Sequence, residues 1–322
     1  MQMVPTTEGE HHLFSHLWQN PGMNQSILTP NQIEQFLTRG FVLVRDCFSR
    51  QAAQALTDQI WPRLGYDPHN RSTWQQSRIH MPTRAHVEIK SFAPKAWAVI
   101  CELCGGAARI IQPAHWGDGF IVNLNDGAQQ AWVPPSPQAK GWHKDGDFFM
   151  HFLDSPEQAL LTIVVWSDID PQGGGTFLAC DSVPQVARYL ADHPEGVHPY
   201  AFPTQQFVDP CTDFVEATGQ VGDVYIMHPY MVHASSFNHS DRVRIITNPP
   251  IFLKEPMSFK RDNPADYSLV ERAVLRGLGA HETTGFDFQI TQPRAAVVPE
   301  RVRIQQKMRD EENQRLGKSA QS

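Results

Sequence analysis

The stretch Gly141-Trp142-His143-Lys144-Asp145-Gly146-Asp147 places an imidazole and a carboxylate two residues apart, among aromatic side chains. In an extended chain, residues i and i+2 point to the same face, so we expect His143 and Asp145 to converge on one point. Two ligands do not close a metal site. A second histidine from elsewhere would complete the two-histidine, one-carboxylate facial triad, which leaves coordination positions open on non-heme Fe(II).

A histidine that could complete this set lies in residues 222–233, a segment that begins with Gly-Asp and has the pattern of a strand. It contains both His228 and His233. These are five positions apart, so a regular strand would point them to opposite faces. His239, in a polar turn, is a third candidate. The residues alone leave this choice open.

An arginine follows the candidate histidines at a defined distance. Arg244 lies eleven positions beyond His233, and Arg242 lies two positions before Arg244. A guanidinium group and a carboxylate match as a bidentate pair. We therefore expect an arginine here to hold the far carboxylate of a small diacid.

Composition limits the class of protein and its partners. The chain has 322 residues, of which 41% are hydrophobic and 19% charged, so it can bury a sizeable core. Its net charge is −7, and it has no long basic run, which argues against nucleic acid as a partner. The longest apolar run, residues 159–166, is too short to span a membrane, and the N-terminus lacks a secretory pattern. We expect a cytoplasmic protein with no membrane partner.

The five cysteines do not indicate a disulfide framework, because their number is odd and they are scattered along the chain. Cys101 and Cys104 form a single CxxC in an apolar stretch. We interpret them as two thiols near the end of a core helix rather than as a redox or zinc pair.

Short apolar runs alternate with Gly, Pro, Asn and Asp turns from residue 109 onward, which is typical of a sandwich or a jelly roll. Helical patterns flank this region, and residues 67–81 are predicted as a loop. One domain with helical additions is simpler than two. The predicted division is an N-terminal arm (1–27), a jelly-roll domain (28–300) and a C-terminal helix or tail (301–322).

Together these motifs resemble the phytanoyl-CoA dioxygenase-like group of Fe(II)/2-oxoglutarate-dependent oxygenases. The resemblance begins at Leu28-Thr29-Pro30 and Gly40-Phe41-Val42-Leu43-Val44, continues through the His143 stretch, and ends with Gly222-Asp223, His233-Ala234-Ser235 and Arg244. It covers about residues 28–250. The fold that it implies is mainly β with flanking helices, a double-stranded β-helix of the cupin-like jelly-roll type.

The resemblance also implies roles for individual residues. It prefers His233 over His228, because the family places its ligand just before a small residue and a serine. Arg244 would bind the distal carboxylate of 2-oxoglutarate, with Ser235 assisting and Arg242 as the alternative. Trp166 matches a position that often lines the cosubstrate pocket. The iron ligands would be His143, Asp145 and His233.

The chemistry implied by the resemblance is oxidation of a small organic molecule with Fe(II), 2-oxoglutarate and O2. Hydroxylation of an aliphatic C–H bond is the commonest outcome, with succinate and CO2 as coproducts. Asp145 disfavours halogenation, because halogenating relatives have a small residue at this position. Residues 179–183 depart from the Pro-Gly-Ser-His turn that members often show, and this leaves the substrate undefined.

Two further interpretations of the sequence are a cupin-like metal-dependent isomerase and a non-catalytic jelly-roll binding protein. The isomerase would not need an arginine after the distal histidine, and the binding protein would not need intact ligands. A basic cluster upstream is either solvated surface or a wall of the substrate pocket. Its members are Arg78, His80, Arg84 and Lys90.

Overall fold

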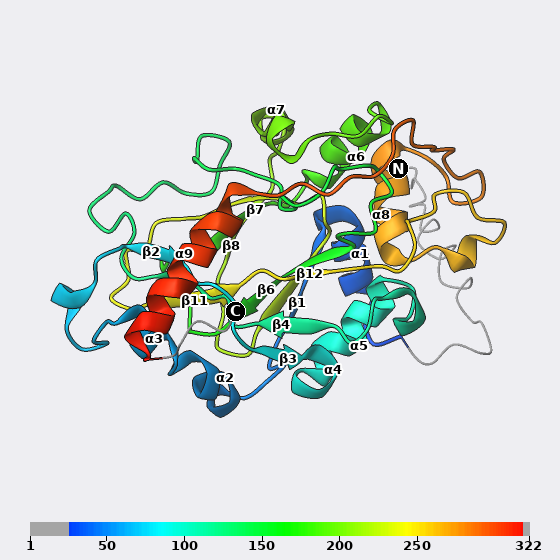
Figure 1. Ribbon diagram of the computed structural model, residues 1–322. Helices are drawn as coiled ribbons and strands as arrows, with labels where there is room; N and C mark the ends of the chain where they lie inside the picture. The colour runs from blue at the N-terminus through cyan, green and yellow to red at the C-terminus, as the bar shows by residue number, and fades with distance from the viewer. Residues whose placement is uncertain (1–25, 318–322) are drawn as a thin grey trace, which may run out of the picture.

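The computed structural model describes residues 26–317, and two antiparallel β-sheets form its centre (Figure 1). In the larger sheet the strand order is β1-β9-β6-β11-β5-β2, with β12 paired to β6, and in the smaller sheet it is β10-β7-β8. A separate pair is formed by β3 and β4. The strands are β1 (Phe41–Val44), β2 (Arg78–His80), β3 (His86–Glu88), β4 (His115–Gly117), β5 (Ile121–Asn123), β6 (Leu160–Val165), β7 (Thr176–Ala179), β8 (Phe214–Ala217), β9 (Val224–Met227), β10 (Val232–Ala234), β11 (Arg244–Thr247) and β12 (Pro250–Ile251).

The two sheets face each other across an apolar interior. Leu161 and Ile163 of β6 belong to one buried cluster with Leu178 of β7. The alternate residues Leu160 and Val164 point outward and belong to a second cluster, which includes the helices. Two antiparallel sheets around one interior, with helices outside, confirm the predicted double-stranded β-helix with flanking helices.

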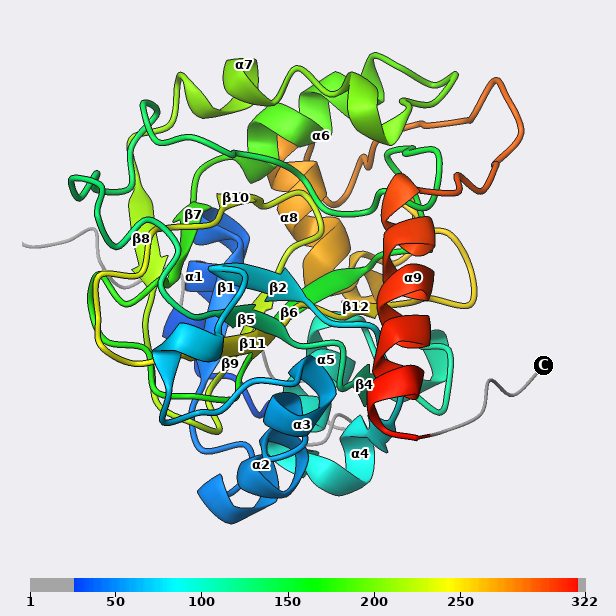
Figure 2. The same ribbon diagram turned by 60° about the vertical axis from the view of Figure 1, so that its left-hand side comes forward.

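Helices cover the outside of the sheets. In both views α6 and α7 lie above the strands and α2 and α4 lie below them (Figure 2). Contacts between α6 and α8, and between α1 and α8, join the helices on one side. The helices are α1 (Pro30–Arg39), α2 (Arg50–Thr57), α3 (Ile60–Leu64), α4 (Ile89–Phe92), α5 (Pro94–Leu103), α6 (Val183–Ala191), α7 (Thr204–Val208), α8 (Leu269–Leu278) and α9 (Glu300–Arg315).

The predicted opening helix and strand are present. Thr29 caps α1, accepting a hydrogen bond from the Gln32 backbone while the Gln32 side chain accepts one from the Thr29 backbone. Gly40 ends the helix with φ 68°, and a Cβ there would lie 2.8 Å from atoms of Met231 and Val183. Glycine is therefore required at this turn, which leads directly into β1 beside β9.

The prediction of a loop over residues 67–81 is wrong at its end, where β2 pairs with β5. Only Ile79 of this strand is buried, while Arg78 and His80 are exposed. An edge strand of three residues with two polar side chains gives no alternation long enough to detect. The strand was missed for that reason.

Cys101 and Cys104 lie at the C-terminal end of α5, and neither is in a disulfide. Burial raises the pKa of the Cys101 thiol to about 11 and that of Cys104 further. In the described part of the chain they belong to no cluster of three metal-ligating side chains. Across residues 26–317, no helix has the length and apolar character that crossing a bilayer requires.

A buried carboxylate ties α8 to the rest of the structure. Glu271 has no exposed surface, and it accepts hydrogen bonds from Arg109 and Arg261 and from the Ser258 backbone. Burial favours the neutral acid, but these donors outweigh it and lower the pKa of Glu271 to about 2. Folding therefore favours the ionised form of Glu271.

We predict that Glu271→Gln destabilises the protein by about 3 kcal/mol at pH 7, because Arg109 and Arg261 lose their shared counter-ion. The wild-type contribution is complete above the unfolded-state pKa of about 4.3 and is lost as the pH falls toward 2. Urea unfolding should therefore show a smaller difference between wild type and variant at pH 3 than at pH 7. Glu34→Gln, which removes the exposed pair with Arg276, is the control and should change little. Equal losses in the two variants would contradict the prediction.

Candidate metal centre

A short antiparallel bridge brings the two halves of the candidate site together. The His143 backbone N–H donates to the His233 carbonyl at 2.9 Å, and the His233 N–H donates to the His143 carbonyl at 3.0 Å. His233 lies in β10, which is held by β7. Because directly opposed residues in such a pair carry their side chains on one face, the imidazoles lie side by side with ring centroids 4.4 Å apart.

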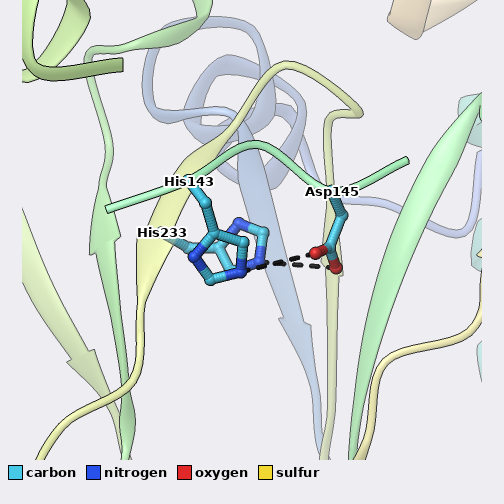
Figure 3. A group of neighbouring side chains, drawn as sticks. All are labelled: His143, Asp145 and His233. Atoms are coloured by element: carbon cyan, nitrogen blue, oxygen red, sulfur yellow. Dashed lines mark ion pairs between the residues drawn. The ribbon is translucent and has the colours of Figure 1, made fainter. Parts of the chain in front are cut away.

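Asp145 faces both imidazoles (Figure 3). Its Oδ1 lies 3.4 Å from His143 Nε2, and its Oδ2 lies 3.4 Å from His233 Nε2. The candidate ligand atoms of the three residues are all within 4.8 Å of one another. This is the donor set of a facial triad, two imidazole nitrogens and one carboxylate.

Backbone carbonyls fix the tautomer of both histidines. His143 Nδ1 lies 2.8 Å from the Gly141 carbonyl, and His233 Nδ1 lies 3.1 Å from the Met231 carbonyl. A carbonyl only accepts, so each Nδ1 carries a proton and Nε2 is the ring nitrogen left to bind a metal. Both Nε2 atoms point at Asp145, and they are therefore prepared to bind a cation.

The carboxylate is oriented by a residue that the sequence did not single out. Asn248 donates from Nδ2 to Asp145 Oδ2 at 2.7 Å. It follows β11 by one residue, on the same face as Arg244, and only the alternation of that strand could have indicated it. Burial opposes ionisation of Asp145, but His233 and His143 outweigh it and hold the pKa of the carboxyl well below its usual range.

The other two candidate histidines lie elsewhere. His228 is fully buried, its Nε2 lies 3.3 Å from the Val270 carbonyl, and burial lowers its pKa to about 3. His239 lies 2.7 Å from the Gln130 carbonyl through Nε2. Of the three, only His233 meets His143 and Asp145.

Arg244 is buried with a charge that lacks a counter-ion. It is 2% exposed and donates to the carbonyls of Gly174 and Ile121, at 2.8 and 3.4 Å. Within residues 26–317 no carboxylate pairs with it. Burial, reinforced by the charge of Arg78, lowers its pKa to about 10, so it remains a cation at neutral pH. A buried cation in this state is suited to an anionic ligand.

The remaining predicted site residues separate into two groups. Ser235, two residues beyond His233, is exposed. Arg242 is also exposed, and it pairs with Asp170 at 3.2 Å. Trp166 lies on the outer face of the larger sheet, where its ring packs against Phe48 and Phe120. The structure therefore does not bring Trp166 to the face that carries Arg244. Its position directly after β6, where side chains alternate between faces, explains this.

The basic cluster also divides. Arg78 of β2 is in register with Asn123 of β5, which is in register with Arg244 of β11, so the three share one face. His80 lies two residues further along this face. Arg84 instead pairs with Glu312, and Lys90 is exposed on α4.

Comparison with known proteins decides the family. Residues 36–246 match the family model of phytanoyl-CoA dioxygenase (PhyH). The chain belongs to the phytanoyl-CoA dioxygenase family. It is therefore an oxidoreductase of the Fe(II)- and 2-oxoglutarate-dependent class, which uses O2.

More specific comparisons are distant. No curated protein matches the chain in sequence. HygX from Streptomyces hygroscopicus, crystallised with nickel, 2-oxoglutarate and hygromycin B, is 14% identical with a TM-score of 0.41, over 70% of this chain and 88% of its own. AviO1 from Streptomyces viridochromogenes Tue57 is 15% identical with a TM-score of 0.40, over 72% and 97%. SnoK, a non-heme alpha ketoglutarate dependent carbocyclase from nogalamycin biosynthesis, is 15% identical with a TM-score of 0.38, over 72% and 87%. At this distance they assign no substrate.

The residues present fit the cofactors of the phytanoyl-CoA dioxygenase family. Two convergent Nε2 atoms and one ionised carboxylate suit a divalent iron ion. The buried guanidinium of Arg244 suits the charge of a dicarboxylate.

We predict that His143→Ala, Asp145→Ala and His233→Ala each abolish tight binding of Ni(II) or Co(II), because each removes one of only three protein donors. Isothermal titration of metal-free protein measures this. His239→Ala should bind metal like the wild type, since its ring contacts the Gln130 carbonyl and the rings of Trp132 and Phe237 and not the candidate donors. Undiminished metal binding in Asp145→Ala would exclude this group as the centre.

Proposed function

We propose that His143, Asp145 and His233 bind Fe(II), that Arg244 binds the distal carboxylate of 2-oxoglutarate with help from Ser235, and that the enzyme hydroxylates an aliphatic C–H bond of a small organic molecule. One observation carries this proposal. Three convergent metal donors lie beside the strand that carries a buried arginine with no carboxylate partner among residues 26–317, because Asn248, four residues beyond Arg244, donates to Asp145.

The protein's share of this reaction is positioning. Iron, with 2-oxoglutarate and O2, supplies the oxidising power for C–H cleavage. The carbonyls of Gly141 and Met231 hold the imidazoles in the metal-binding tautomer. Asn248 donates to Asp145 Oδ2 and so fixes the orientation of the carboxylate that would bind the metal. These contacts fix the ligand directions before any cofactor binds.

Exposure of the ligands supports a substrate that approaches beside His143. The His143 side chain is 47% exposed and Asp145 is 21% exposed, whereas His233 is 5% exposed. The centre is thus closed on the β10 side and open on the other. Phe148, three residues beyond Asp145, contacts the partly exposed Phe252 that follows β12, with ring centroids 6.2 Å apart, and the two rings favour a substrate with apolar parts.

Arg78 favours a polar or anionic group on that substrate. Its one ion pair is a contact of 3.5 Å with Asp126, longer than a charge-assisted hydrogen bond, and its side chain is 36% exposed. Because it shares a face with Arg244, its remaining N–H groups point toward a ligand bound on that face. Coproducts of the proposed reaction are succinate and CO2.

We predict that anaerobic addition of Fe(II) and then 2-oxoglutarate to metal-free protein produces a weak visible charge-transfer band. Arg244→Gln should weaken 2-oxoglutarate binding by about a hundredfold, because the buried charge that receives the carboxylate is lost. Arg242→Gln is the matched control and should bind like the wild type, since Arg242 is exposed and paired with Asp170. The two affinities follow from titration of the band.

Several results would contradict the proposal. Iron binding without a charge-transfer band would show that 2-oxoglutarate does not bind the iron at this centre. Equal losses of 2-oxoglutarate affinity in Arg242→Gln and Arg244→Gln would contradict a specific role for Arg244. With a substrate in hand, a product that does not gain one oxygen atom from 18O2 would exclude hydroxylation.

A further inference from the structure

The C-terminal segment lies outside the family match yet contacts the candidate metal loop. The Met150 N–H donates to the Ala295 carbonyl at 2.9 Å, and the Val297 N–H donates to the Phe148 carbonyl at 2.8 Å. Phe149 and Ala296 form an antiparallel bridge between these bonds. Residues 295–297 therefore run as a strand-like partner of the chain directly after Asp145.

An ion pair continues this contact to within two residues of Asp145. Arg301, in the first turn of α9, binds Asp147 through two hydrogen bonds, Nε to Oδ2 at 2.5 Å and Nη2 to Oδ1 at 2.7 Å. The two hydrogen bonds restrain the carboxylate in orientation as well as in position. The hydrogen bond to Asp147 raises the pKa of Arg301. Burial lowers this pKa, and the negative charges of Asp147 and Asp145 raise it further.

The chain between Asp145 and Asp147 transmits this restraint. Gly146 has φ 112°, and a Cβ there would lie 2.6 Å from His151 and 2.8 Å from Phe149. His151 also holds the loop, because its Nε2 lies 2.7 Å from the Gly146 carbonyl. A single, tightly packed residue therefore separates the candidate ligand from the carboxylate that Arg301 holds.

The far end of α9 is anchored independently. Glu312 is 2% exposed and pairs with Arg63 at 2.7 Å and with Arg84 at 2.6 Å. Arg63 is also buried and bonds the carboxylate of Asp118. Eleven residues, about 16 Å of helix, separate Glu312 from Arg301. Figure 2 shows α9 as one continuous helix along the side of the sheets, so it acts as a rigid support between the two contacts.

Stability alone does not account for the pair of Arg301 and Asp147. Their side chains are 47% and 29% exposed, so solvent screens the attraction and limits its contribution to folding. The buried pairs of Glu312 already hold α9 on the body of the protein. What the Arg301 pair adds is a fixed position for the loop that carries two of the three candidate ligands.

We propose that Arg301 is a positioning residue of the metal centre, which acts through Asp147 to hold His143 and Asp145 in the geometry that binds the metal. This inference rests on the proposed metal ligands. It assigns part of the centre to a C-terminal helix outside the family match, and it makes the metal affinity of the enzyme depend on that helix.

The test is a double-mutant cycle of Arg301→Gln and Asp147→Asn, read out as Ni(II) affinity by calorimetry and as the visible spectrum of the Co(II) protein. Each single variant should bind Ni(II) about tenfold more weakly, with an altered Co(II) spectrum. The double variant should lose no more than either single one, because the two residues act as one unit. Arg303→Gln is the matched control, since Arg303 pairs only with Glu300 on the exposed face of the same helix, and it should match the wild type.

Native Ni(II) affinity and Co(II) spectrum in Arg301→Gln would overturn the inference and leave the pair as a surface contact. A loss in Asp147→Asn without one in Arg301→Gln would also overturn it, since Asp147 would then act alone. If Arg301→Gln does not fold, Arg301→Lys, which keeps the charge but loses the two-bond geometry, should show the weaker binding. A failure of the proposed metal ligands can be told apart from a failure of the Arg301 inference, because in the first case the wild type itself would not bind Ni(II) at this centre.

Discussion

The backbone pairing of His143 with His233 is the constraint on which the centre depends. Two residues ninety positions apart meet because one short bridge joins the chain before Asp145 to β10. Since β10 is held by β7, the smaller sheet determines where the distal histidine lies. The proximal pair needs only an extended chain, but the triad needs this register. A shift of one residue would turn His233 away from Asp145.

Charge is distributed unevenly over the buried part of the structure. Glu271 lies between two arginines, and Arg63 lies between two carboxylates, so each of these buried charges is compensated by the protein. Arg244 is equally buried and has only carbonyl partners in the described chain. This contrast with the paired buried charges favours an anionic ligand for Arg244.

How far the sequence predicts this site depends on the range of each interaction. His143 and Asp145 are predictable because their relation is local, and the fold class is predictable from the apolar runs and turns. The choice between His228 and His233 is set by strand register, which the residues alone do not define. The resemblance preferred His233, and the geometry brings His233 to Asp145. Asn248 and Arg301 could not be predicted because each acts through tertiary contacts, and β2 is too short and polar to show an alternation. Trp166 lies on the outer face of the larger sheet, away from the face of Arg244.

The most direct test of the central claim is a crystal structure of the protein with Ni(II) and 2-oxoglutarate. The structure predicts one metal ion bonded to His143 Nε2, Asp145 and His233 Nε2, with the distal carboxylate of 2-oxoglutarate on the Arg244 guanidinium. A metal bound through His228 or His239, or a carboxylate held by Arg242 in place of Arg244, would contradict it.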